Sequence, residues 1–335
     1  MSAAATGRTP EVVDVSRPDP ASWFAQTFKL MADNIALAVM GKQQTVHFAL
    51  TCLLTEGHML IEDVPGTGKT MLAKALAATV KGSHNRIQFT PDLLPSDVTG
   101  VTIYDQKTQI FEFHEGPIFA TIVLADEINR ASPKTQSALL EVMEEGRITV
   151  DGVAHPVGRP FMVIATQNPI EQAGTYRLPE AQLDRFLMKT SLGRLDHESM
   201  VAVLSDSATR DRTAAIQPVI TADVVAQMSQ IADNVHVDQA ILGYVSRLAE
   251  ESNRHPHVKL GLSVRGCLAL VRCAKTWAIA SGRNFVVPDD IKTLATPVMC
   301  HRVLLDAEAQ FGGTTIDEVL GQILDIVPPP SQRVA

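Results

Sequence analysis

The sequence is poor in aromatic residues, in basic runs and in long apolar stretches. Phe, Trp and Tyr make up only 5% of the 335 residues, which leaves little material for stacking on nucleic-acid bases. The formal net charge of −8 disfavours general binding to phosphate backbones. No apolar run approaches the roughly 18 residues of a membrane span, and residues 1–20 contain no apolar core of a signal peptide. We therefore expect no membrane span and no nucleic-acid partner.

Cysteine is also scarce. The sequence contains Cys52, Cys267, Cys273 and Cys300, which form no C-x-x-C pair and lie in apolar stretches. Isolated cysteines in such surroundings are typically small buried hydrophobic residues rather than metal ligands or disulfide partners. Free thiols are the rule in reducing compartments, so we expect a cytoplasmic location.

Short apolar strands alternate with helices between about residues 21 and 200. This alternation is typical of an α/β domain built on a parallel sheet. Nearly continuous apolar runs indicate strands that are buried on both faces. Five strands are predicted, at residues 57–62, 86–90, 120–125, 160–166 and 185–192.

Two hairpins are predicted as insertions into this α/β domain, at about residues 97–116 and 146–160. The second contains Asp151-Gly152, a dipeptide typical of two-residue hairpin turns. Residues 201–327 have mostly helical periodicity, for example at 221–251, which predicts a helical lid domain. Residues 1–20 are predicted to be a disordered tail, and 328–335 a C-terminal tail.

The strongest motif is a glycine-rich loop between a predicted strand and a predicted helix. It reads Asp63-Val64-Pro65-Gly66-Thr67-Gly68-Lys69-Thr70, followed by Met71 in the helix. Glycines let backbone N–H groups turn around nucleotide phosphates, and the helix N-terminus adds the positive end of its dipole. Lys69 is expected to reach the β- and γ-phosphates and Thr70 to bind Mg²⁺. Asp63 departs from the general pattern, which has Gly at that position.

Polar residues follow two of the predicted strands. Asp126 and Glu127 end one strand, and Asn168 follows another. The carboxyl ends of parallel strands meet at the sheet edge where the glycine-rich loop also lies. Because neighbouring strand residues point to opposite sides, Asp126 is expected to support Mg²⁺ and Glu127 to polarise the attacking water. Asn168 is placed to hydrogen-bond the γ-phosphate or that water.

Three arginines are further candidates, and each has two interpretations. Arg130 either faces solvent or reaches the nucleotide of a neighbouring subunit. Arg185, between a helix end and an edge strand, either forms a structural ion pair or enters the next subunit's site. Such arginines accelerate hydrolysis by about 10³–10⁵ in GTPases. Arg265 opens a lid helix, which is common by itself, or leans over the γ-phosphate from the lid.

Several longer segments resemble the MoxR family of AAA+ ATPases. These are residues 62–70, 89–100, 124–136, 164–170 and 178–186, within a resemblance that covers about residues 25–305. The resemblance implies an AAA+ P-loop fold with a parallel 5-1-4-3-2 sheet and a C-terminal all-helical lid. It also implies the following site: Walker A at Lys69 and Thr70, Walker B at Asp126 and Glu127, sensor 1 at Asn168, arginine finger at Arg185 and sensor 2 at Arg265.

The resemblance further implies a hexameric, chaperone-like remodeller that uses ATP and Mg²⁺. Members of this family often work with proteins that carry a von Willebrand factor A domain. The family is also linked to the maturation of client proteins. We therefore expect an ATP-hydrolysing ring that remodels a protein client. Two alternatives stay open, a nucleotide-switched assembly scaffold with slow hydrolysis and a chelatase-type ATPase motor subunit. A motor acting on DNA is disfavoured by the acidic charge.

Overall fold

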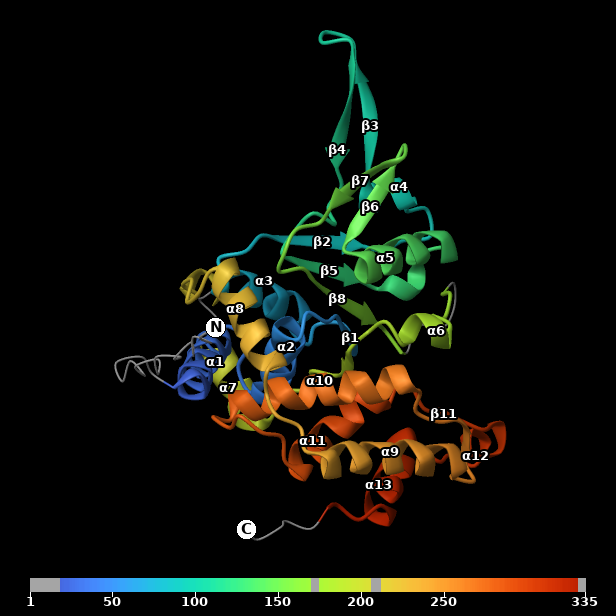
Figure 1. The fold of residues 1–335 in the computed structure, drawn as a ribbon. Helices are drawn as coiled ribbons and strands as arrows, with labels where there is room; N and C mark the ends of the chain where they lie inside the picture. The colour runs from blue at the N-terminus through green and yellow to red at the C-terminus, as the bar shows by residue number, and fades with distance from the viewer. Residues whose placement is uncertain (1–18, 170–174, 206–211, 331–335) are drawn as a thin grey trace, which may run out of the picture.

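A computed structural model describes residues 19–169, 175–205 and 212–330. A parallel five-stranded sheet lies at the centre of the α/β part (Figure 1). Across the sheet, its strands are β2 (His84–Gln88), β5 (Ile122–Asp126), β8 (Met162–Gln167), β1 (Met59–Glu62) and β9 (Met188–Thr190). Numbered in chain order within this sheet, the strands run 5-1-4-3-2 from β9 to β2. The expected AAA+ topology is confirmed.

The apolar character of the central strands follows from burial on both faces. Every residue of β5 is buried. Ile122 and Leu124 contribute to one core and Val123 and Ala125 to another, as the alternation of strand side chains requires. The helices that cover these faces are α1 (Pro20–Ala36), α2 (Gln43–Leu54) and α3 (Lys69–Thr79) on the first, and α4 (Pro95–Thr99) and α5 (Pro133–Glu145) on the second.

The chain forms antiparallel hairpins at both predicted insertions. In the first, β3 (Gly100–Asp105) pairs with β4 (Ile110–Glu115). In the second, β6 (Arg147–Val150) pairs with β7 (Val153–Pro156). Figure 1 shows β3–β4 projecting far beyond the sheet, with β6–β7 beside its base.

The second hairpin turns as its sequence predicts and touches the first. Asp151 and Gly152 have φ angles of 50° and 80°, as the mirror-image turns of two-residue hairpins require. The rings of Phe113 in β4 and His155 in β7 stack with their centroids 3.9 Å apart. The two insertions therefore share a contact near the body of the protein.

The C-terminal part is helical, as expected. Its helices are α7 (His197–Ser205), α8 (Ala222–Asp233), α9 (Gln239–Arg254), α10 (Val264–Ala280), α11 (Pro288–Met299), α12 (Ala307–Phe311) and α13 (Ile316–Ile326). The helical stretch predicted at 221–251 is divided into α8 and α9, because the Asp238 side chain caps a new helix. Two short antiparallel strands, β10 (Val258–Leu260) and β11 (Leu304–Leu305), were not predicted.

The described part of the chain begins at Asp19, directly before the first helix, and ends at Pro330. Pro20 begins α1, after an Asp19 side chain that accepts the Ser22 N–H. Residues 1–18 and 331–335 lie outside the described residues. Within the described ranges, no helix has both the length and the apolarity to cross a bilayer.

The cysteines are free thiols in or near the core. Cys52 and Cys273 are buried, and Cys267 and Cys300 are half-buried. Burial raises the pKa of the Cys273 thiol to about 12, so this side chain stays protonated at neutral pH. A hydrophobic role for this residue agrees with the prediction.

Candidate active site

The glycine-rich loop joins the end of β1 to the start of α3. Lys69 and Thr70 are the first residues of that helix, and Gly68 caps it with a φ of 101°. Gly66 also has a positive φ, of 85°, and a Cβ there would meet no atom within 4 Å. Both glycines supply a left-handed backbone that other residues rarely adopt. The loop thus has a left-handed backbone at both glycines and open space beside Gly66, next to a helix N-terminus, which suits a phosphate group.

The Lys69 side chain closes over this loop. Its ammonium group donates to the carbonyl oxygens of Asp63 at 3.0 Å and Val64 at 3.1 Å. These are short-range bonds within one turn of chain, and the loop is half-exposed. The ammonium therefore lies beside the first residues of the loop, where it can bind an incoming phosphate.

Asp63 begins the glycine-rich loop, and its side chain has partners that the motif did not predict. Its buried carboxylate accepts three backbone N–H groups. These are Val64 N at 2.9 Å, Leu192 N at 2.9 Å and Gly193 N at 2.8 Å. Asp63 therefore fastens the start of the loop to the segment that follows β9 and leads toward the helical part. The motif position alone gave no signal for these partners.

We expect Asp63→Ala to lower the free energy of unfolding by about 2–4 kcal/mol, because the buried Leu192 N–H and two part-buried N–H groups lose a charged acceptor. Urea unfolding at neutral pH measures this loss. Asp63→Asn is the matched control, since its amide oxygen can still accept a hydrogen bond, and it is expected to lose less. Equal stability of Asp63→Ala and the wild type would contradict the structural role.

Asp126 is held at the end of β5 by two side chains from neighbouring strands. The Thr166 hydroxyl in β8 donates to its Oδ1 at 2.6 Å. The Arg86 guanidinium in β2 donates to its Oδ2 at 2.6 Å. Neither partner was predicted from the sequence. Thr166 carried a detectable signal, since it is a polar residue that directly follows the apolar run Met162–Ala165 and is fully buried.

Glu127 is not a strand residue, which corrects the alternation argument. β5 ends at Asp126, and Glu127 has φ 58° and ψ 48°, a left-handed conformation that costs a non-glycine residue about 1–2 kcal/mol. The Thr166 hydroxyl accepts the Glu127 N–H at 2.9 Å and so supports this backbone. Non-glycine residues in this region cluster at functional sites. The conformation, rather than strand alternation, directs the Glu127 carboxylate.

The Glu127 carboxylate has two partners within its own chain. Gln88 Nε2 donates to Oε2 at 2.9 Å, and Arg130 Nη1 donates to the same oxygen at 3.0 Å. Arg130 lies in a short 3₁₀ helix (Ile128–Arg130) directly after Glu127. Neither predicted interpretation of Arg130 anticipated this pairing. Gln88 lies opposite Asp126 in the β2–β5 register, so β2 supplies a neighbour to each carboxylate.

Asn168 lies directly after β8, at the same edge of the sheet. The preceding residue, Gln167, pairs with Glu62 and accepts the Asp63 N–H at 3.0 Å through its carbonyl oxygen. Asn168 is buried. The structure thus brings the predicted sensor next to the start of the glycine-rich loop, together with Asp126 and Glu127.

This edge has the donors that a magnesium nucleotide requires. Mg²⁺ prefers oxygen ligands and usually binds through one or two carboxylates together with substrate phosphates. Asp126 supplies a carboxylate, and Thr70, in the first turn of α3, supplies a hydroxyl. The residues therefore fit the ion in chemistry.

Arg185 and Arg265 lie at the opposite edge of the sheet, where the amino ends of the parallel strands are. Arg185 follows α6 (Glu180–Leu183) and precedes β9, as predicted, and pairs with Glu144 at 3.0 Å. Arg265, in the first turn of α10, pairs with the same Glu144 at 3.2 Å. Glu144 lies in the last turn of α5, next to Met143, whose carbonyl oxygen is 2.9 Å from His58 Nε2. His58 precedes β1, whereas the glycine-rich loop follows it.

The position of Arg265, beside Glu144 and Asp184, separates it from the glycine-rich loop of its own chain. The length of β1, four residues, separates the two edges by about 13 Å at the rise of a strand. The sequence indicated that Arg265 opens a helix, but the packing of the lid decides which edge that helix faces. Arg185 and Arg265 are thus brought together with each other and not with Lys69.

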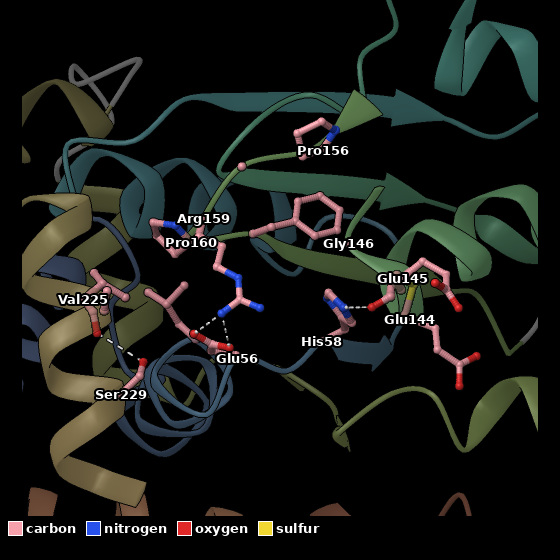
Figure 2. A pocket seen from close by; sticks show the side chains of 15 residues that line it. Glu56, His58, Glu144, Glu145, Gly146, Pro156, Arg159, Pro160, Val225 and Ser229 are labelled. Atoms are coloured by element: carbon pink, nitrogen blue, oxygen red, sulfur yellow. Dashed lines mark hydrogen bonds and ion pairs between the residues drawn. The ribbon is translucent and has the colours of Figure 1, made fainter. Parts of the chain in front are cut away.

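A cavity of about 420 Å³ marks this opposite edge (Figure 2). Figure 2 shows His58 between the Arg159–Glu56 ion pair on one side and Glu144 on the other. The Val163 N–H donates to His58 Nδ1 at 3.0 Å, so the proton of the neutral ring is on Nε2. Burial lowers the pKa of His58 to about 4. The ring is therefore neutral and fixes the end of α5 to β1 and β8.

Comparisons with known proteins agree with this geometry. A family profile described as "ATPase family associated with various cellular activities (AAA)" matches residues 58–188, and an AAA lid domain profile matches residues 250–323. Similar proteins include YeaC of Bacillus subtilis, 46% identical over 90% of this chain and 95% of its own length. The chaperone MoxR1 of Mycobacterium tuberculosis is 38% identical over 87% of this chain and 79% of its own length. The chain belongs to the MoxR family of AAA+ ATPases.

A solved structure extends the likeness to three dimensions. A crystal structure of a protein from Cytophaga hutchinsonii superposes with a TM-score of 0.87 and 36% identity, over 93% of this chain and 97% of that one. In this MoxR-family chain, the AAA match contains the glycine-rich loop, Asp126, Glu127, Asn168 and Arg185. The lid match contains Arg265. Each candidate residue therefore lies in a segment that the family shares.

Proposed function

We propose that this chain hydrolyses ATP with Mg²⁺ and couples hydrolysis to the remodelling of a protein client, as a hexameric ring. One observation carries the proposal. The loop and carboxylates that suit ATP lie at one edge of the sheet, while two arginines that suit a γ-phosphate lie at the other. A single chain therefore holds two parts of a site that do not meet within it.

At the loop edge each residue has a separate task. Lys69 and the loop N–H groups bind the β- and γ-phosphates, and Thr70 and Asp126 would hold Mg²⁺, which neutralises phosphate charge. Glu127 orients a water and takes its proton as the water oxygen bonds to the γ-phosphorus. The bond between the γ-phosphorus and the bridging oxygen breaks, and ADP leaves. Asn168 orients the γ-phosphate or the water.

The opposite edge completes the site of a neighbour. When one face of a subunit binds a different face of the next, the contact repeats head to tail and closes into a ring if the rotation allows. In such a ring Arg185 and Arg265 meet the phosphates bound by the adjacent copy. Their charges then stabilise the developing negative charge of the transition state.

The projecting hairpin is the surface that we assign to the client. Its exposed apolar side chains are Val101, Ile103, Tyr104, Ile110 and Phe111. Tyr104 and Phe111 pair across the strands with ring centroids 5.1 Å apart. Exposed apolar groups gathered on one element mark interaction sites. A partner with a von Willebrand factor A domain, implied by the family resemblance, would deliver or receive that client.

The rate of ATP hydrolysis per protomer, measured against protein concentration, tests the shared site. We expect the rate to rise with concentration and then to level off, because each site needs a neighbour. Light scattering on the same samples relates the rise to assembly. A flat and negligible rate in fully assembled protein would contradict the proposal and favour the scaffold alternative.

A further inference from the structure

One carboxylate joins the two arginines of the far edge. Glu144 Oε2 lies 3.0 Å from Arg185 Nη2, and Glu144 Oε1 lies 3.2 Å from Arg265 Nη2. The three residues come from separate elements. Glu144 is near the end of α5, Arg185 lies between α6 and β9, and Arg265 begins α10 of the lid. The carboxylate therefore bridges the α/β part and the helical part.

The bridge has an electrostatic consequence. Two guanidinium groups that approach the same point repel each other, and the repulsion is strong where water is partly excluded. A carboxylate between them offsets that repulsion, and each of its oxygens accepts from one arginine. With an uncharged residue at position 144, the two arginines are expected to move apart.

A second carboxylate anchors the same group from behind. Asp184 Oδ2 lies 3.8 Å from Arg265 Nε, and Asp184 Oδ1 accepts from Arg302 Nε at 2.7 Å. The Arg302 side chain is only 3% exposed and also donates to the carbonyl oxygen of Phe186 at 2.7 Å. The segment that carries Arg185 is thus fixed to the lid. Glu144 contacts both Arg185 and Arg265, whereas Asp184 contacts Arg265 and Arg302.

The arrangement leaves both arginines able to bind an anion. A guanidinium group has five N–H donors, and each arginine uses one nitrogen on Glu144. The Arg185 side chain is 29% exposed and the Arg265 side chain is 52% exposed. Donors of both side chains therefore remain for a ligand that approaches this edge from outside the chain.

We propose that Glu144 is a positioning residue that holds Arg185 of the α/β part and Arg265 of the lid side by side, so that both meet the same terminal phosphate of a neighbouring copy. The proposal rests on the shared site of the proposed function. Glu144 does not contact the nucleotide. It acts by setting the separation of the two arginines before that phosphate arrives.

The variant Glu144→Gln removes the charge and keeps the size of the side chain. We expect its kcat to fall about 10-fold, the effect of weakening charged hydrogen bonds at a half-exposed site. Binding of a fluorescent ADP analogue to its own loop should stay within about a factor of two of wild type, since the loop lies at the other edge. Sedimentation should show unchanged assembly. The matched control, Glu145→Gln, removes a carboxylate that pairs with Arg147 at 3.3 Å and should keep the wild-type rate.

Two further measurements separate positioning from a merely structural role. The conservative variant Glu144→Asp should recover part of the rate that Glu144→Gln loses. In exchanging mixtures, Glu144→Gln protein should regain activity with Lys69→Ala protein, which supplies an intact far edge. It should gain none with Arg185→Ala protein, which is damaged at the same edge.

Several outcomes would overturn the inference. They are an unchanged or increased kcat in Glu144→Gln, an equal loss in Glu145→Gln, no recovery in Glu144→Asp, and no regain with Lys69→Ala. An increased kcat would mean that Glu144 restrains the arginines. A mixture of Arg185→Ala with Lys69→Ala separates a failure of the shared site from a failure of the role of Glu144. If that mixture regains activity and Glu144→Gln turns over normally, only the role of Glu144 fails. If that mixture regains nothing, the shared site itself fails.

Discussion

Glu127→Gln is expected to bind ATP normally and to hydrolyse it about 10²–10⁴ times more slowly, the usual contribution of a general base. Glutamine keeps the size of the side chain and can still accept the Gln88 and Arg130 hydrogen bonds at its oxygen. It cannot take a proton from water. The Thr166 hydroxyl should still support the left-handed backbone, because that bond involves the main-chain N–H. The lost function is therefore confined to the chemistry.

Phosphate release under saturating ATP measures the rate, and equilibrium binding of a fluorescent ATP analogue measures the affinity. Glu115→Gln is a suitable control, because it removes an exposed carboxylate at the end of β4 that has no proposed part in hydrolysis. Normal turnover in Glu127→Gln would remove Glu127 from the mechanism. Loss of ATP affinity in the same protein would instead indicate a role in folding the site.

The P-loop edge was predictable because short sequence patterns determine it. A strand, two glycines, Lys69 and a helix fix the phosphate loop locally, and the carboxylates at the end of β5 follow from the parallel sheet. The sheet order came from the resemblance to the MoxR family. The positions of Lys69, Asp126 and Asn168 at one edge therefore agree with the expectation.

The remaining features depend on contacts between distant segments. The conformation of Glu127 relies on Thr166, and the bonds of Asp63 rely on Leu192 and Gly193. No local pattern encodes such pairs, since they exist only after the strands are in register. For the same reason, the sequence left open which subunit's γ-phosphate Arg265 approaches. Its helix was predictable from the sequence, but the direction of that helix is set by packing of the lid.

Arg185→Ala is expected to lower turnover by about 10³-fold or more, in the range of arginine fingers elsewhere, while it binds ATP normally. The reason is spatial. Arg185 pairs with Glu144 beside the start of β1, so its removal leaves the loop of its own chain intact. Lys69→Ala is the complementary variant, because it damages the loop and leaves the arginine edge intact. Arg159→Ala is the control, since Arg159 has a side chain 80% exposed.

Mixing the two inactive proteins gives a quantitative expectation. A complete site needs an intact loop in one subunit and an intact Arg185 in the next. In an equal, freely exchanging mixture that assembles head to tail at random, about a quarter of the subunit contacts meet this condition. Turnover should therefore approach a quarter of the wild-type rate, although each protein alone is inactive. A site completed within one chain would give no recovery at any ratio. A bell-shaped dependence on the mixing ratio, with its maximum at equal amounts, is the result that a site shared between neighbours requires.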